Sequence, residues 1–303
     1  MEIHQLQYFV AIVEAGGFSR AAQRCNVAQP SLSQQIIKLE QELGQQLFER
    51  LGRTVLLTDA GKALLPRAQS ILAEVQSIKS GIDDALNTGV GRLAVGMIPT
   101  LAPFLLPKTI QSFTQRFPAA KLEVVEQTTE MLLKALITFE LDVCFISAPI
   151  SHPLVMLEEL FQEPLLMTIP RCHSLARVGK LVVDMLHEEP FIALNEDHCL
   201  SQQVNTFCYE QQVNPVVVCR TTHLTTVQSC VTMGLGVSLV PAMLSAVDMS
   251  RQCVYRRIAD VFPQRTIAAA WHSHRSRSHL LTQFIQCVRE ANAALEYHIE
   301  DDI

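Results

Sequence analysis

Apolar and polar residues recur at helical spacing near the start of the chain. Hydrophobic side chains three and four positions apart predict a first helix over residues 6–15 and a short second helix over residues 18–25. We expect Ser19 to cap the second helix. Only the turn 26–28 separates it from a third amphipathic segment, so the pattern predicts a helix-turn-helix.

The third helix, residues 28–43, is predicted to start abruptly and to carry two unlike faces. Pro30 suits a first helical position, and Gly44 is a typical stop. The expected apolar face consists of Ile36, Ile37, Leu39 and Leu43. The other face holds small and amide side chains, which bond to base edges and phosphates, whereas an idle solvated face is typically rich in Glu–Lys pairs. We therefore predict that this helix reads a DNA major groove; two ordinary core helices are the alternative. The predicted DNA contacts are Gln29, Pro30, Ser31, Ser33, Gln34 and Lys38.

Residues 47–57 are predicted to form two short strands around Gly52, which is the pattern of a hairpin wing. Arg50 and Arg53 stand on either side of that turn. We expect them to contact phosphates or a minor groove; two solvated surface arginines are the alternative.

A long helix is predicted from residue 58 to about residue 86, with apolar residues in alternating steps of four and three. That spacing favours dimerisation through one seam, and packing against its own domain is the alternative. The seam residues are Leu64, Ala68, Ile71, Val75, Ile78 and Ile82. Residues 87–91, Asn-Thr-Gly-Val-Gly, break the helix and indicate a domain boundary.

From residue 92 onward, short apolar runs alternate with helical segments, which predicts a parallel α/β sheet. Strands are predicted at residues 93–98, 122–126, 143–146, 165–169, 191–194, 216–219, 236–240 and 267–271, and helices at residues 103–116 and 129–139. Ligands of such sheets bind beyond the carboxyl ends of the strands. Pro99, Thr100, Thr128, Thr129 and the segment after Leu194 occupy those ends.

Composition narrows the class of protein. The 303 residues suffice for two domains, and 49% hydrophobic with 18% charged residues is typical of a globular protein. The net charge is −6, and six basic residues balance six acidic ones within residues 1–65. DNA binding is therefore expected to depend on the arrangement of charges more than on bulk attraction.

Other sequence features bear on location and chemistry. The N-terminus lacks the pattern of a signal peptide, and no apolar stretch approaches the roughly 20 residues of a membrane span, so we expect a cytoplasmic protein without membrane contact. Nine cysteines cannot all pair, and in that compartment they start as free thiols. There is no GxGxxG, P-loop or metal-ligand spacing. We expect no cofactor, no metal and no enzymatic activity; an enzyme with an appended DNA-binding domain is the alternative from another class.

Cys199 and Cys208 form a candidate redox pair. We predict one helix through both, capped by Asn195 or Asp197. Nine residues of helix span about 13 Å, whereas a disulfide needs Cα atoms about 4.4–6.8 Å apart, so the bond requires unwinding. The helix N-terminus and a protonated His198 would lower the pKa of Cys199, and the neighbouring acidic residues would raise it. The alternative is two small buried hydrophobes.

The N-terminal motifs resemble the LysR-type transcriptional regulators. The resemblance is carried by residues 9–15, Gly17-Phe-Ser-Arg-Ala-Ala22, Gln29-Pro-Ser-Leu-Ser-Gln34, Ile37-Lys-Leu-Glu40, Leu43-Gly44, Leu47-Phe48, Arg53, Leu57-Thr58 and Gly61. It implies an α/β protein with a winged helix-turn-helix (1–58), a linker and dimerisation helix (59–87) and a doubly wound effector domain (88–303). The effector domain would comprise subdomain I (88–162 and 267–303) and subdomain II (163–266), with crossings near Gln162 and Thr266 around a ligand cleft. The implied partners are operator DNA, further copies in a homodimer or homotetramer, and RNA polymerase.

The second half is similar to peroxide-sensing members of that family. The matching residues are Ile98-Pro-Thr100, Leu105-Leu-Pro107, Thr129, His198-Cys-Leu200, Phe207-Cys208, Met233-Gly-Leu-Gly236 and Pro241. The resemblance implies that Cys199 is oxidised by hydrogen peroxide, that Cys208 resolves it as a disulfide, and that Thr100, Thr129 and His198 hold the peroxide. Ser201 and Gln202 depart from the Arg-Asp of those relatives. A small organic effector in the same cleft, with the cysteines incidental, is the alternative.

Overall fold

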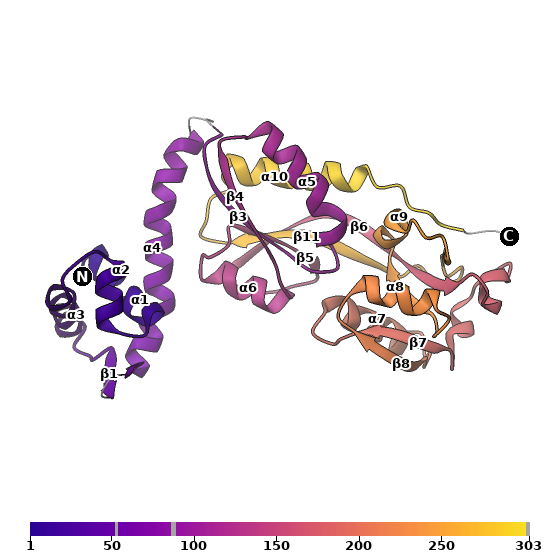
Figure 1. Ribbon diagram of the computed structural model, residues 1–303, viewed down its shortest axis with the longest axis horizontal. Helices are drawn as coiled ribbons and strands as arrows, with labels where there is room; N and C mark the ends of the chain where they lie inside the picture. The colour runs from indigo at the N-terminus through magenta and orange to yellow at the C-terminus, as the bar shows by residue number, and fades with distance from the viewer. Residues whose placement is uncertain (52–53, 86–88, 301–303) are drawn as a thin grey trace. The chain divides into compact units, whose positions relative to one another are not determined.

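The computed structural model describes residues 1–51, 54–85 and 89–300, without the side chains of residues 50, 51, 54, 73 and 76–85 (Figure 1). The chain divides into two compact units. One comprises Met1–Leu86 with Ile137–Phe139, and the other comprises Asn87–Leu136 with Glu140–Ile303. None of the helices in these described ranges is long and apolar enough to cross a membrane.

The N-terminal unit contains a helix-turn-helix, a hairpin and a long helix. Its elements are α1 (Ile3–Ala15), α2 (Phe18–Arg24), α3 (Gln29–Leu43), β1 (Phe48–Leu51), β2 (Thr54–Leu57) and α4 (Asp59–Ala85). The two strands pair antiparallel, as the predicted wing requires. Helices and hairpin share one buried core, which includes Leu6, Phe9, Ile12, Ala21, Leu32, Ile36, Leu39, Leu47 and Ala68.

Local chemistry explains where these helices begin and end. α1 and α3 stop at Gly16 and Gly44, both in the left-handed conformation that favours glycine. Thr58 starts α4, because its Oγ1 accepts a hydrogen bond from the Gly61 N–H at 3.0 Å. A Cβ on Gly61 would lie 2.3 Å from the carbonyl oxygen of Leu47, so only glycine lets α4 approach the hairpin this closely.

Two details of the predicted helix-turn-helix are wrong. Ser19 does not cap α2: Gly17 occupies the N-cap position, and no side chain caps the helix there. Ile37 and Leu43, expected on the apolar face of α3, are 44% and 40% exposed. The buried face instead begins with Leu32, because contacts with α1 and α2 decide which face of α3 turns inward.

Strands and helices alternate through the second unit. In chain order they are β3 (Gly91–Met97), α5 (Ala102–Arg116), β4 (Ala120–Glu126), α6 (Thr129–Ile137), β5 (Val143–Ala148), β6 (Val155–Pro170), η1 (Ser174–Arg177), η2 (Val183–Leu186), β7 (Pro190–Leu194), α7 (Cys199–Glu210), β8 (Val216–Thr221), α8 (Leu224–Thr232), β9 (Ser238–Pro241), α9 (Met243–Val247), β10 (Cys253–Arg256), β11 (Gln264–His272) and α10 (His279–Ala293).

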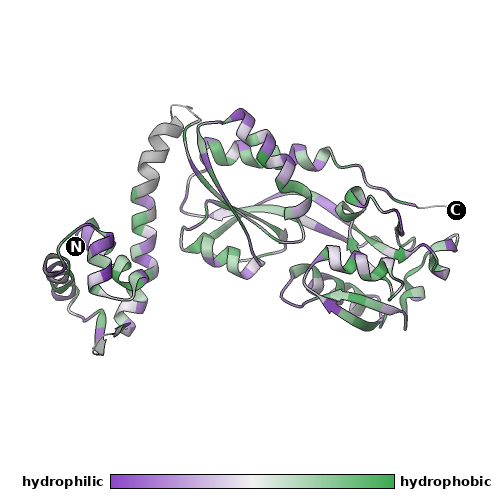
Figure 2. Ribbon diagram, in the orientation of Figure 1, coloured by the Kyte–Doolittle hydropathy of each residue, from purple (hydrophilic) through white to green (hydrophobic). Residues whose placement is uncertain are grey.

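The sheets of this unit are mixed, whereas the sequence pattern predicts parallel ones. β3 is parallel to β4 and β5, and β7 is parallel to β8. β11 is antiparallel to both β5 and β6, because the chain leaves the first sheet along β6 and returns along β11. In Figure 1, α5 and α10 lie on one face of the first sheet and α6 on the other. Figure 2 shows that the strands between them are largely hydrophobic. β5 is buried in all but its last residue.

β6 carries the chain from the first sheet, which contains β3, β4, β5 and β11, to a second sheet, which contains β9 and β10, whereas β7 and β8 pair separately. Its residues up to Pro164 pair with β11, and its residues from Leu165 onward pair with β9 and β10. Gln162 and Thr266, the predicted crossing points, are direct partners in the β6–β11 ladder. The two predicted crossing points thus lie opposite each other in one ladder, and the subdomain boundaries drawn from them stay a prediction.

Candidate functional site

The outward face of α3 is polar and accessible, as a DNA-reading helix requires. Its first two turns are exposed at every predicted contact except Ser33, which is half-buried, and Leu32 anchors the opposite face in the core. The predicted contact Lys38 is also exposed. The amide of Gln34 therefore reaches solvent from a rigid helix, in the manner of a major-groove reader.

The structure describes the tip of the β1–β2 wing and the C-terminal end of α4 only in part. The side chain of Arg50 and the whole of Arg53 lie outside the described residues, as do the side chains of Ile78 and Ile82. Their predicted roles in DNA contact and dimerisation stay predictions.

The first turns of α4 pack inside their own domain. Ala68 is fully buried in the core of the helix-turn-helix unit, and Leu64 packs against that core. A side chain without exposed surface in one chain cannot contribute to a dimer contact, so the seam prediction is corrected for Ala68. Ile71 is 39% exposed and Val75 is half-buried, so within the described residues these two are accessible for the predicted seam, which stays a prediction.

Cys199 is the first residue of α7. The predicted caps are wrong: His198 holds the N-cap position, and no side chain caps the helix, so neither Asn195 nor Asp197 does. Two other contacts fix this end of the helix. The Asn195 N–H donates to the carbonyl of Thr221 at 2.8 Å, and the Ser201 hydroxyl donates to the carbonyl of Leu194 at 2.9 Å.

Both cysteines of the candidate pair belong to α7, and both are free thiols. Nine residues of intact helix separate them by about 13 Å, so they cannot bond while α7 stands. Cys208 is half-buried, and burial raises the pKa of its thiol. The thiol is therefore protonated at neutral pH.

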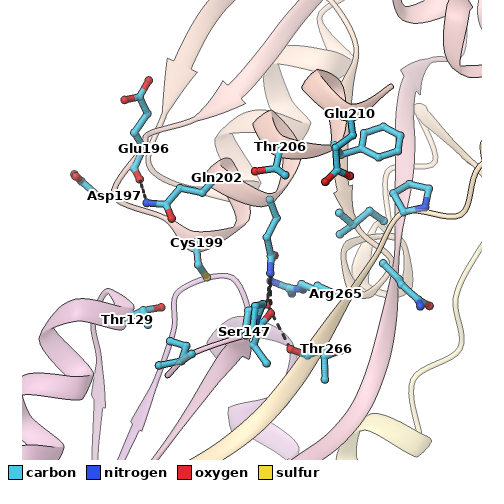
Figure 3. A pocket seen from close by; sticks show the side chains of 18 of the residues that line it. Thr129, Ser147, Glu196, Asp197, Cys199, Gln202, Thr206, Glu210, Arg265 and Thr266 are labelled. Carbon is cyan, nitrogen blue, oxygen red and sulfur yellow. Dashed lines mark hydrogen bonds between the residues drawn. The ribbon is translucent and has the colours of Figure 1, made fainter. Parts of the chain in front are cut away.

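A cleft of about 1390 Å³ opens beside the start of α7. The carboxyl ends of β4 and β5, the exposed side of α7 and the start of β11 form its walls. Cys199 extends from α7 toward the wall that carries Thr129 and Ser147 (Figure 3). Three of the predicted pocket residues, Thr128, Thr129 and Cys199, therefore line one cavity.

The other predicted pocket residues, Pro99, Thr100 and His198, do not line this cleft. Thr100 is 2% exposed, and its hydroxyl and carbonyl oxygens accept hydrogen bonds from the Arg265 guanidinium at 2.7 and 3.1 Å. The threonine side chain is thus already hydrogen-bonded inside the protein.

His198 is also buried, and this corrects its predicted electrostatic role. Burial lowers the pKa of the imidazole; Asp197 opposes that shift, and His223 adds to it. The ring is therefore neutral at neutral pH. A protonated His198 does not supply the positive charge that the sequence suggested for Cys199.

Two polar contacts of the cleft were not predicted. Arg265 lines it from β11 and pairs with Glu163 at 2.7 Å, both side chains being shielded from solvent. Gln203 extends from α7 and donates to the hydroxyl of Ser147 at 2.9 Å and to the carbonyl of Ala148 at 3.2 Å. Gln203 thus connects α7 to β5 in the first sheet. This contact is long-range in sequence, so no local motif predicts it.

No metal chemistry is indicated at the cleft. Among the residues that the structure describes, no group of three or more histidine, cysteine or acidic side chains is placed to hold a metal ion. The groups that line it are a thiol, hydroxyls, amides, one paired guanidinium and the carboxylates of Glu130, Glu196, Asp197 and Glu210. They suit thiol chemistry or the binding of a small polar molecule.

A winged helix-turn-helix followed by a long helix and a two-sheet α/β domain with a cleft defines a DNA-binding regulator with a sensory domain. The chain belongs to the LysR family: residues 3–62 match the bacterial regulatory helix-turn-helix proteins of the lysR family, and residues 87–293 match the LysR substrate binding domain. It is a LysR-type transcriptional regulator by both halves.

Full-length relatives are similar along the whole chain. Escherichia coli K12 OxyR, described as a DNA-binding transcriptional dual regulator, is 35% identical over 302 residues, 99% of this chain and 98% of the relative. Full-length OxyR of Pseudomonas aeruginosa with a cysteine-to-aspartate replacement has a TM-score of 0.75 at 30% identity, covering 98% of this chain and 99% of that one. A cysteine-to-serine mutant of Corynebacterium glutamicum OxyR, solved with hydrogen peroxide bound, has a TM-score of 0.66 at 32% identity, covering 96% and 92%.

Proposed function

We propose that this regulator is switched by oxidation of Cys199 to a disulfide with Cys208, with hydrogen peroxide or a related oxidant as its signal. The observation that carries the proposal is the position of Cys199. It is the first residue of a helix at the edge of a cleft, and a second free thiol, Cys208, lies in the same helix. The peroxide-bound OxyR among its relatives supports the choice of oxidant.

The chemistry takes two steps. The Cys199 sulfur attacks one peroxide oxygen; an S–O bond forms, the O–O bond breaks, and the departing hydroxide takes the thiol proton to leave as water. The Cys208 sulfur then attacks the sulfenic acid; the S–S bond forms, the S–O bond breaks, and a second water leaves. Two thiols lose two electrons, and one peroxide becomes two waters.

The second step requires α7 to unwind, because the helix keeps the two sulfurs too far apart. Unwinding would release the bonds of Ser201 to Leu194 and of Gln203 to Ser147. The latter bond joins α7 to β5 in the first sheet, so the change reaches across the cleft. This is the physical route by which a local oxidation alters how the two sheets are held together.

We infer that the output is sequence-specific binding to operator DNA by paired helix-turn-helix units. One α3 reads one half-site, so a two-fold operator needs a homodimer or a homotetramer of paired dimers. The exposed Ile71 on α4 and the polar face of α3 support this assignment. RNA polymerase is the proposed protein partner on the promoter.

A second candidate function is the binding of a small organic effector in the cleft. The volume of about 1390 Å³ favours it, since the cleft would admit a molecule far larger than peroxide. Under this interpretation the cysteines are incidental, and the cleft closes on a ligand instead.

Mass spectrometry after mild peroxide treatment tests the proposal. We expect a Cys199–Cys208 link in the wild type, none in Cys199→Ser, and a sulfenic acid trapped by dimedone at Cys199 in Cys208→Ser. A control variant replaces the remaining cysteines, which are Cys25, Cys144, Cys172, Cys219, Cys230, Cys253 and Cys287. That variant should respond like the wild type, apart from any packing cost. Normal oxidant-dependent transcription in cells carrying Cys199→Ser would overturn the thiol switch and favour the effector.

A further inference from the structure

The chain after α10 connects the two halves of the effector unit at a place separate from β6 and β11. One half holds the first sheet with α5, α6 and α10, and the other holds the second sheet, the β7–β8 pair, α7, α8 and α9. Residues 294–300, which we call the C-terminal segment, leave the end of α10 and run past α9 to β10 (Figure 1). The segment therefore begins on one half and ends on the other.

Backbone hydrogen bonds fix the far end of the C-terminal segment. The Glu300 N–H donates to the carbonyl of Tyr255 in β10 at 2.8 Å, and the Glu300 carbonyl accepts from Nε of the buried Arg256 at 3.2 Å. Two residues earlier, the His298 N–H donates to the buried hydroxyl of Ser245 in α9 at 3.1 Å. These bonds engage the backbone of the segment, so they set its path directly.

The C-terminal segment has the side-chain pattern of an extended strand. Alternate residues pack against the hydrophobic core, and these are Leu295, Tyr297 and Ile299. Glu296 and His298 between them are exposed, which gives the two-residue period of a β-strand. An extended chain has little slack, because it already spans close to its maximum of about 3.3–3.6 Å per residue. The ends of the segment therefore cannot move apart unless its bonds to α9 or β10 break.

The C-terminal segment and the cleft lie on opposite sides of the crossing strands β6 and β11. The cleft is lined by the start of α6, including Thr129 and Leu133, on one face of the first sheet. The segment begins at α10 on the other face and passes α9, which contacts α5. A rotation about β6 and β11 that narrows the cleft therefore pulls the two ends of the segment apart.

We propose that the C-terminal segment is a strap that limits how far the cleft can close. Closure requires a longer path from α10 to β10, and the extended chain cannot supply it. Full closure therefore requires the release of Glu300 from Tyr255 or of His298 from Ser245. The strap acts on the movement of the two halves, so it goes beyond the proposed function and does not depend on oxidation of Cys199.

Double electron–electron resonance on the full-length protein tests the strap. Spin-labelled noncanonical amino acids replace Glu130 in α6 and Glu210 in α7, because thiol reagents would modify the nine native cysteines. Both positions are exposed and line the cleft, one in each half. Dilution with unlabelled protein restricts the measured distances to one copy. Glu300→Pro removes the N–H that bonds to Tyr255, and we expect it to add a population with a shorter label-to-label distance.

Two control variants separate the strap from other effects of that replacement. Glu300→Gln keeps the N–H and alters only the exposed ion pair with Arg171, so its distances should match those of the parent protein. Glu296→Pro places proline where no hydrogen bond of the backbone N–H is found among the described residues, and its distances should match as well.

Ser245→Ala releases the segment at its other anchor, because it removes the acceptor of the His298 N–H. It should also add the shorter-distance population, and it decides the test if far-UV circular dichroism shows that Glu300→Pro is misfolded. Distances that stay unchanged or become longer in the released variant would overturn the strap. An equal shift in Glu296→Pro would overturn it too.

Discussion

Arg265 and Glu163 form a 2.7 Å ion pair, shielded from solvent, at the point where β6 and β11 pass between the two sheets. The same guanidinium donates to the hydroxyl and carbonyl oxygens of Thr100, and the other oxygen of Glu163 accepts the backbone N–H of Met243. One buried pair therefore joins the segment before α5, the two crossing strands and the start of α9. Each charge depends on its partner, because neither is solvated.

Glu163→Gln is expected to destabilise the effector unit by about 3–5 kcal/mol, because Arg265 stays charged and buried without its partner. Urea unfolding followed by the fluorescence of Trp271 measures the loss. The control is Glu123→Gln at the exposed Arg92–Glu123 pair, where solvent screens the charges and the loss should be much smaller. Equal losses in the two variants would show that burial does not strengthen the pair.

Gln34→Ala is expected to weaken binding to the cognate operator by roughly 1–3 kcal/mol, because Gln34 is exposed on α3 where a base edge is read. Binding to random DNA should persist. Fluorescence anisotropy with both duplexes at one salt concentration measures the two effects. A matched control is Gln41→Ala at the exposed C-terminal end of the same helix, which should leave both unchanged. Equal losses on the two duplexes would mean that Gln34 reads no base.

Ile71→Glu is expected to dissociate the oligomer, because a carboxylate in the α4 seam would be buried without a partner in each copy. Ile71 suits this test because it is 39% exposed in the single chain, so its replacement leaves the domain's own core intact. Analytical ultracentrifugation measures the mass. Ala63→Glu adds the same charge at an exposed position of α4 and should leave the mass unchanged. An intact oligomer in Ile71→Glu would contradict the role of α4 in dimerisation.

The sequence predicts best what depends on local spacing. Apolar periodicity and Gly44 place α3, and the rule that ligands bind beyond strand ends correctly brings Thr128 and Thr129 to the cleft. The same rule fails for Thr100, because Arg265 bonds both of its oxygens. That guanidinium comes from a strand far along the chain, so no local pattern reveals its position.

Non-local pairing accounts for the other differences. The first half of β6 and the whole of β10 were not predicted, because their strand character comes from partners distant in sequence. Glu163 and Arg265 lie 102 positions apart, and each alone is typical of a solvated surface residue. The neutral state of His198 likewise follows from burial, which depends on the folded chain and not on the neighbouring Asp197.

His198→Gln is expected to reduce the loss of stability in mild acid. The folded-state pKa of His198 lies below its ordinary 6.5, chiefly because of burial, so the unfolded chain binds this proton first. The contribution of His198 is present above pH 6.5 and is lost as the pH falls through the folded-state pKa. One such group gives a slope of at most about 1.4 kcal/mol per pH unit. Urea titrations between pH 7.5 and 5 measure it.

His272 provides the comparison for that experiment. It is 3% exposed, and its pKa is lowered by burial and by the nearby His274 and Arg275. Part of the acid sensitivity should therefore persist in His198→Gln and diminish further when His272 is replaced as well. A slope in His198→Gln identical to that of the wild type would show that His198 is not the group that titrates.

Ser201→Ala is expected to accelerate the disulfide step of the proposed switch. The Ser201 hydroxyl is buried and donates to the carbonyl of Leu194 at 2.9 Å, which ties the first turn of α7 to the end of β7. Loss of one such bond costs the folded helix about 1 kcal/mol and does not touch the unwound one. If unwinding limits the rate at saturating peroxide, the Cys199–Cys208 link should form about fivefold faster. Rapid quenching with an alkylating agent and mass spectrometry measure the rate.

Gln202→Ala is the matched control, because Gln202 is exposed in the same turn and its side-chain amide donates a long hydrogen bond of 3.4 Å to the carbonyl of Glu196. That contact is too weak to hold the helix, so Gln202→Ala should form the disulfide at the wild-type rate. Ser201→Arg, which introduces the residue that related peroxide sensors carry at this position, is a poorer test than Ser201→Ala, because the guanidinium would have to be buried here. Equal rates for the wild type, Ser201→Ala and Gln202→Ala, with sulfenic acid accumulating equally at Cys199, would show that the first turn of α7 does not control disulfide formation.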